Sequence, residues 1–113
     1  MSELVRRKYA NEYGVCQCYT CDKTMDWREI QAGHGISGRG GFVLFLEEVI
    51  KPQCHVCNVF RGGEYQRFIP KLIDEYGTEQ YQDWVIDSRK PFKRTKKDWI
   101  ALVYELQARL KEL

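Results

Sequence analysis

The sequence has no hydrophobic run of the roughly 20 apolar residues that a transmembrane helix needs. Its N-terminal stretch, MSELVRRKYANEYG, also lacks the apolar core of a signal peptide. Internal repeats and low-complexity tracts are absent as well. These absences argue against a membrane protein and favour a soluble chain that stays in the cytoplasm.

An excess of charge of one sign is also lacking. The formal net charge of +2 is too small to predict a nucleic-acid partner by itself. The basic residues are nevertheless unevenly distributed, because the segment SRKPFKRTKK (88–97) contains six Lys or Arg and no acid. With 113 residues, the chain fits one domain with a modest core, for which a metal is a common source of extra stability.

Histidine is rare, with two residues, whereas cysteine occurs five times. In a reducing compartment, clustered cysteines more often bind a metal than form disulfides. Cys18 and Cys21 form one C-x2-C pair, and Cys54 and Cys57 form another. Two such pairs can supply four thiolates to a tetrahedral zinc ion. We therefore predict a structural Zn²⁺ between two cysteine knuckles and interpret Cys16 as a bystander thiol.

Local patterns predict an α+β chain in the order helix, two strands, then helices. Helices are expected at 2–13, from Asn58 onward, at 78–88 and at 96–113, and strands at 28–34 and 42–46. Residues 16–28 are expected to form an irregular loop, and the glycine-rich segment 35–41 to connect the two strands as a hairpin. Pro70 should limit the helix from Asn58 or lie in the first turn of the next one.

The last predicted helix begins with a capping-box pattern, Thr95 followed by Asp98. Its apolar residues recur at alternating steps of four and three, at Trp99, Val103, Leu106, Leu110 and Leu113. This period is typical of a coiled-coil seam. Packing on the chain's own domain and formation of a homodimer both fit the pattern.

The two cysteine pairs enclose the predicted hairpin, with His34 on its first strand and Asn58 directly after the last cysteine. The string CYTC…QAGH…PQCHVCN resembles the HNH, or ββα-metal, nucleases with a four-cysteine zinc, and most of all the NinG/Rap family of phage recombination nucleases. The likeness covers about residues 14–77. It implies a small ββα-metal core, flanked here by N- and C-terminal helices.

The resemblance implies hydrolysis of DNA, often at branched intermediates such as Holliday junctions or D-loops, with one catalytic Mg²⁺ or Mn²⁺ per site. By matching position, His34 would be the general base and Asn58 a ligand of the cation, with Glu64 a further tentative ligand. An imidazole accepts a proton near neutral pH, and hard cations take oxygen ligands. The basic residues expected to contact DNA are Arg39, Arg61, Arg67, Lys93, Arg94 and Lys96. For a phage-encoded protein, the cytoplasm would be that of the host cell.

The expected organisation is a zinc-braced nuclease domain at 1–87, a basic linker at 88–95 and an amphipathic helix at 96–113. The partners implied are branched DNA and a second copy of the chain, but no membrane.

Several positions depart from the family pattern. Gly33 stands where an acidic metal ligand usually precedes the histidine, Val49 replaces an asparagine that orders the loop, and Lys51 replaces a further histidine. These departures leave two alternatives, a zinc-stabilised module that binds DNA without cutting it, or an adaptor in a recombination complex.

Overall fold

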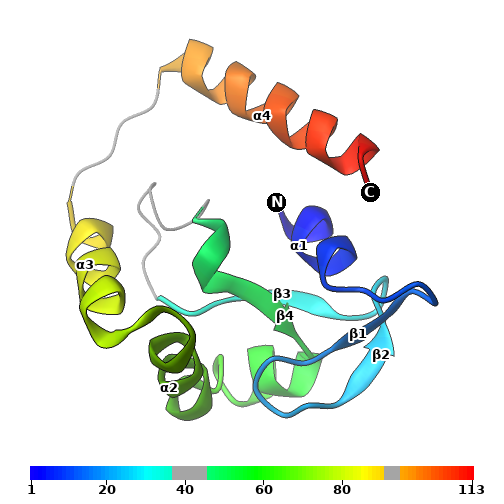
Figure 1. Ribbon diagram of the computed structural model, residues 1–113, viewed down its shortest axis with the longest axis vertical. Coiled ribbons are helices and arrows are strands. Elements are labelled where there is room, and N and C mark those ends of the chain that lie inside the picture. Colours follow the sequence, from blue (N-terminus) through cyan, green and yellow to red (C-terminus); the bar gives the residue numbers. More distant parts are fainter. Residues whose placement is uncertain (37–45, 91–94) are drawn as a thin grey trace.

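The computed structural model describes residues 1–36, 46–90 and 95–113. Its elements are α1 (Ser2–Lys8), β1 (Val15–Gln17), β2 (Thr24–Asp26), β3 (Gln31–His34), η2 (Glu47–Val49), β4 (Ile50–Gln53), η3 (Val56–Phe60), α2 (Tyr65–Tyr76), α3 (Thr78–Ser88) and α4 (Lys96–Lys111). Figure 1 shows two small sheets between α1 on one side and α2 on the other, with α4 running past α1 at the edge of the molecule. The expected α+β class is confirmed. None of these helices is long and apolar enough to span a membrane.

The first sheet is an antiparallel hairpin of β1 and β2, in which Cys16 pairs with Met25. The expectation of an irregular loop at 16–28 is therefore wrong. The hairpin turn carries the first cysteine knuckle, and the Cys18 amide donates to the carbonyl of Lys23 at 2.8 Å. Asp22 adopts a positive φ of 64° in this turn. The short strands were missed because they lack the apolar alternation that marks a strand in sequence.

The second sheet pairs β3 with β4, and His34 lies opposite Ile50. The described partner of the first predicted strand is therefore 50–53, a strand that the sequence did not predict. Of the predicted strand at 42–46, residues 42–45 lie outside the described residues, and Leu46 precedes the 3-10 turn η2. All four residues of β4 are buried, including the polar Lys51 and Gln53, so burial does not alternate along this strand.

The helix expected from Asn58 does not begin there. Residues Val56–Phe60 form a single π-type turn, and α2 starts at Tyr65 with Pro70 inside it. Helix α1 also ends earlier than expected, at Lys8, whereas α3 matches its predicted span of 78–88. The sequence order β3, β4, helix is present, with the π-type turn inserted before α2.

The interior consists of two clusters. One joins the cysteines to an isoleucine and contains Cys16, Cys18, Ile30, Cys54 and Cys57. The other packs α2 against the start of the 35–49 connection and contains Ile36, Val49, Phe68 and Leu72. The first cluster has little apolar surface other than its thiols, so its cohesion depends on how those sulfurs are used.

Helix α4 begins with the predicted capping box, in which Thr95 and Asp98 bond reciprocally. Its half-buried residues Leu102, Leu106 and Leu110 recur on one face, and the helix contacts α1. Arg109 forms an ion pair with Glu47 at 2.7 Å. Part of the apolar stripe therefore packs on the chain's own domain.

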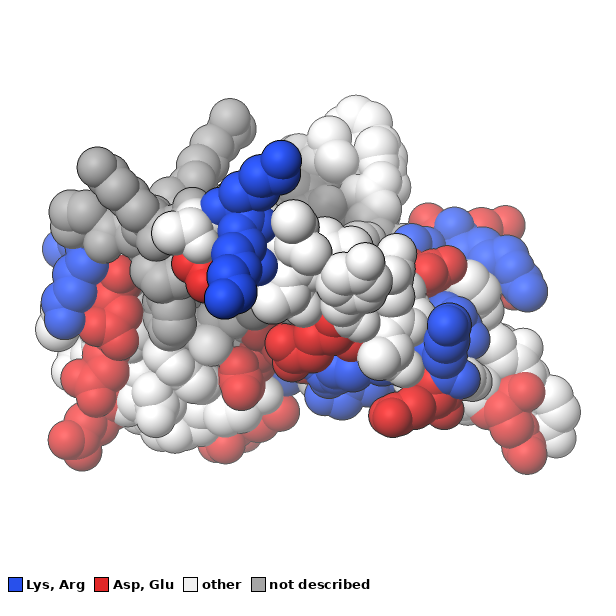
Figure 2. All heavy atoms as spheres, turned by 90° about the horizontal axis from the view of Figure 1, so that it is seen from above, with Lys and Arg blue, Asp and Glu red and all other residues white. Residues whose placement is uncertain are grey.

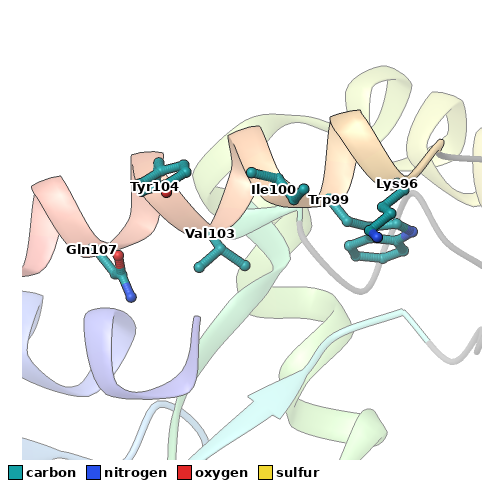
Figure 3. A pocket seen from close by; sticks show the side chains of 6 residues that line it. All are labelled: Lys96, Trp99, Ile100, Val103, Tyr104 and Gln107. Atoms are coloured by element: carbon teal, nitrogen blue, oxygen red, sulfur yellow. The ribbon is translucent and has the colours of Figure 1, made fainter.

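Helix α4 also has an exposed apolar surface. An open groove on it is lined by Lys96, Trp99, Ile100, Val103, Tyr104 and Gln107, all from this helix (Figure 3). Lysine, arginine and carboxylate side chains are interspersed on the face seen in Figure 2.

Candidate functional site

Four cysteine sulfurs converge between the two hairpins. The β1–β2 turn supplies Cys18 and Cys21, and the turn after β4 supplies Cys54 and Cys57. Their Sγ atoms all lie within 4.8 Å of one another, and those of Cys21 and Cys54 are 3.6 Å apart. A tetrahedral zinc ion with Zn–S bonds of about 2.3 Å holds its sulfurs roughly 3.8 Å apart. The donor set and its spacing fit a structural zinc ion.

Hydrogen bonds to the sulfurs favour thiolates. The Cys57 amide donates to Sγ of Cys54 at 3.5 Å, and the Thr20 hydroxyl lies 3.5 Å from Sγ of Cys18. Burial acts to raise the pKa of Cys18, but the bonds from Thr20 and from backbone amides outweigh it and lower this pKa to about 6. Burial raises the pKa of Cys21 to about 12. The pKa values of these two thiols therefore differ widely. A metal ion that binds thiolates removes this difference, because it keeps all four cysteines deprotonated.

The fifth cysteine lies outside this group. Cys16 points from β1 into the cysteine cluster, and the four-sulfur set found among the described residues does not include it. Burial raises its pKa. It is therefore a buried thiol beside the centre, in agreement with its interpretation as a bystander.

A buried amide braces the first knuckle from β4. Gln53 donates from Nε2 to the Thr20 hydroxyl at 3.1 Å and to the carbonyl of Gly63 at 2.8 Å. Its side chain fills the space in front of Gly33, where an added Cβ would clash with Oε1 of Gln53. The absence of an acidic residue before His34 therefore has a steric cause.

His34 ends strand β3, where it is half-buried. Asn58 lies in the π-type turn and donates from Nδ2 to Oε1 of Gln31, the first residue of the same strand, at 2.9 Å. Gln31 also bonds Nδ1 of His55 at 2.9 Å. The structure thus brings Asn58 and His34 to one strand, near its start and its end respectively. Neither Gln31 nor a role of His55 in this network was predicted from the sequence.

The backbone replaces the loop-ordering side chain at Val49. This residue is fully buried, and its carbonyl accepts a hydrogen bond from the Gly35 amide at 2.7 Å. Gly35 lies against Phe68 and Leu72 of α2, where a Cβ would clash. Gly35, directly after His34, is therefore fixed by a main-chain bond and by close packing on α2.

Two of the residues predicted to contact DNA form contacts within the protein. The Arg61 guanidinium lies 3.5 Å from the Glu64 carboxylate and 3.8 Å from Sγ of Cys57. Arg67 donates to the carbonyl of Thr20 at 3.5 Å, which links α2 to the first knuckle. Both side chains still reach the surface. Pairing with Arg61 also occupies the carboxylate of Glu64, the tentative cation ligand.

The other predicted DNA contacts are less informative. Lys96 is exposed at the start of α4. Arg39, Lys93 and Arg94 lie outside the described residues.

The surroundings of Lys51 are the feature that was least predictable from the sequence. Its side chain is fully buried, and Nζ donates to the hydroxyls of Tyr9 at 3.0 Å and Tyr76 at 2.9 Å and to Glu75 at 3.3 Å. The ring centre of Tyr19 is 5.4 Å from Nζ. Burial opposes the charged form, but the tyrosine bonds outweigh it and raise the pKa of Lys51. We call this group the Lys51 cage, and it ties α1, the first knuckle, β4 and α2 together.

Comparison with known proteins gives one finding. The family model described as Bacteriophage Lambda NinG protein matches residues 1–113. No curated protein and no solved structure matches the chain.

Proposed function

Because the chain belongs to the bacteriophage lambda NinG protein family, we propose that it is a zinc-stabilised endonuclease that cuts DNA with the help of a divalent cation. Branched recombination intermediates are the proposed substrate. The observation that carries the proposal is the four-sulfur centre, which fixes the start of the Asn58 turn against the strand that ends in His34. Such a centre can hold catalytic groups in place without taking part in the chemistry.

In the proposed reaction His34 removes a proton from the attacking water, as an imidazole can near neutral pH. Asn58 supplies an oxygen to the cation. Its amide nitrogen donates to Gln31, so Oδ1 is the atom that we propose as the ligand. Mg²⁺ or Mn²⁺ accepts such an oxygen and, when bound, neutralises charge on the leaving oxygen.

The remaining cation ligands would be water and phosphate oxygens of the substrate, because Mg²⁺ usually keeps several non-protein ligands. Glu64 stays a weaker candidate, since Arg61 neutralises its charge. The cation should therefore bind the protein–DNA complex much more tightly than it binds the free protein.

A homodimer through α4 forms part of the proposal. Trp99, Ile100, Val103 and Tyr104 leave an apolar strip exposed on α4. A second copy would cover this strip, and two active sites related by a two-fold axis suit paired cuts in a symmetric junction.

The test is cleavage of a labelled four-way junction with Mg²⁺, with Mn²⁺ and with no divalent ion. His34→Ala and Asn58→Ala should each abolish cutting while the protein keeps its zinc and its affinity for the junction. His55→Ala is a third variant and not a control, because His55 bonds the same Gln31 side chain that holds Asn58. Cutting by the His34→Ala protein at the native rate would refute the proposed base.

A second candidate is a module that binds branched DNA without cutting it. It is favoured by the packing of Gln53 in front of Gly33, which leaves no room for the usual acidic ligand, and by burial of Lys51 in its cage. Junction binding with no cleavage under any metal would establish this candidate in place of the first.

A further inference from the structure

A second basic surface lies away from His34 and Asn58, around Trp27 at the end of the first hairpin. Three guanidinium groups surround its indole ring, with the Cζ atoms of Arg6, Arg7 and Arg28 at 5.6, 5.7 and 4.9 Å from the ring centre. Two come from α1 and the third follows β2. We call this group the Trp27 patch. None of its members was among the DNA contacts expected from the sequence.

The patch is firmly built. Trp27 packs against the cysteine cluster, and Arg6 donates to the carbonyl of Trp27 at 3.0 Å. The ring is therefore held by the metal centre on one side and by α1 on the other. Guanidinium groups on an indole face are stabilised by about 0.5–1 kcal/mol each at exposed sites.

The positive charge of the patch is poorly compensated. Arg28 is 69% exposed and has one acidic neighbour, Asp26, at 3.3 Å. Arg7 has no ion pair within the part of the chain that the structure describes. A polar hollow of about 670 Å³ beside the patch is lined by Trp27, Arg28, the 10–14 loop, Arg7, Lys8 and Leu113, with Glu12 as its one acidic side chain among the described residues. Three like charges gathered at one ring favour an anion with several negative groups.

We infer that the Trp27 patch is a second DNA-binding surface, which binds the phosphate backbone of a duplex arm while another arm occupies the His34–Asn58 site. The inference rests on the proposed function for its choice of DNA as the anion. Arginine forks match phosphate geometry, and backbone contacts position a protein on DNA without reading sequence. A branched substrate presents arms in different directions, so two separate contact surfaces suit it better than they suit a single linear duplex.

The test compares Arg7→Gln/Arg28→Gln with Lys23→Gln/Lys111→Gln, a control pair that removes the same charge from exposed positions outside the patch. Arg6 is left intact because it bonds the backbone of Trp27. The probes are a synthetic four-way junction and a linear duplex of equal length, titrated by fluorescence anisotropy without divalent ions at several salt concentrations. Zinc content and thermal unfolding establish that both variants are folded.

The patch variant should bind the junction at least roughly tenfold more weakly than the control. Its plot of log affinity against log salt should be shallower by up to about 1.8, which corresponds to two lost phosphate contacts in B-DNA. Arg7→Lys/Arg28→Lys should recover most of the slope, because the salt dependence of binding counts the charges that neutralise phosphates.

Equal losses in the patch and control variants would overturn this inference and leave the nuclease proposal standing. An unchanged salt slope in the patch variant would do the same. If the native protein binds neither probe at any salt concentration, the proposed function and this inference both fail.

Discussion

Removing one zinc ligand should unfold the half of the domain that the two knuckles build. The change is Cys54→Ala, which takes one sulfur from the centre. The reason lies in the composition of the cysteine cluster, where Ile30 is the one fully buried member other than the thiols within the described chain. Burying an isoleucine contributes about 1.5–3 kcal/mol. Structural zinc in small domains contributes about 10–16 kcal/mol.

These magnitudes decide the outcome. A domain of 113 residues has an unfolding free energy of roughly 6–17 kcal/mol, at about 0.05–0.15 kcal/mol per residue. Loss of the metal therefore removes a contribution as large as the whole. Cys54→Ala, and the native protein treated with a strong chelator, should both lose the cooperative thermal transition or show it at least about 20 °C lower.

The matched control is Cys16→Ala, which deletes a sulfur from the same buried cluster but not from the four-sulfur set. It should keep one zinc per chain, measured by a colorimetric chelator after denaturation, and unfold within about 10 °C of the native protein. If Cys54→Ala retains one zinc per chain, or unfolds at the same temperature as Cys16→Ala, the assignment of the metal centre is wrong.

Three further changes test other parts of the molecule. Lys51→Met should lower the free energy of unfolding by about 1–3 kcal/mol at neutral pH, because Tyr9, Tyr76 and Glu75 lose their buried donor. The raised pKa of Lys51 means that this stabilisation is complete below about pH 10 and is lost as pH rises further. Urea unfolding at pH 7 and 11 checks both points. Ion pairs with Arg109 and Lys8 lower the pKa of Glu47 to about 2. The stabilisation of α4 by Glu47 is therefore complete above about pH 5 and is lost as pH falls towards 2. The rate of hydrogen exchange in α4 should rise as pH falls through this window, and Glu47→Gln should raise the same rate already at pH 7. His34→Ala should reduce single-turnover junction cleavage by about 10²–10⁴-fold with unchanged junction affinity, and a reduction of less than threefold would contradict its role as the base.

The metal centre was predictable from the sequence because each knuckle is a local feature. Two residues between a pair of cysteines are enough to aim both sulfurs at one ion, whatever lies between the pairs. The capping box at Thr95 was predictable for the same reason, since all its atoms lie within one helical turn.

Features made by distant residues were not predictable. The partners of Lys51 come from α1, the first knuckle and α2, and no sequence pattern relates them. Strand β4 was missed because it is buried on both faces and includes Pro52, whose carbonyl bonds the Tyr19 amide at 2.8 Å. The apolar run at 42–46 looked more like a strand because hydrophobicity is the strongest local signal. The face of α4 that packs on the domain could not be predicted from the sequence, because it depends on the contact with α1 and on the ion pair with Glu47.

The contact between Gly33 and Gln53 constrains how this site can change. An acidic side chain at position 33 cannot be introduced alone, because it would enter the volume that the Gln53 amide fills. Shortening Gln53 alone would strip the Thr20 hydroxyl and the Gly63 carbonyl of their shared donor. The effect of a substitution at position 33 therefore depends on the residue at position 53, which makes the two positions epistatic. A variant with a carboxylate at position 33 needs a substitution at position 53 as well, whether it arises in evolution or in the laboratory.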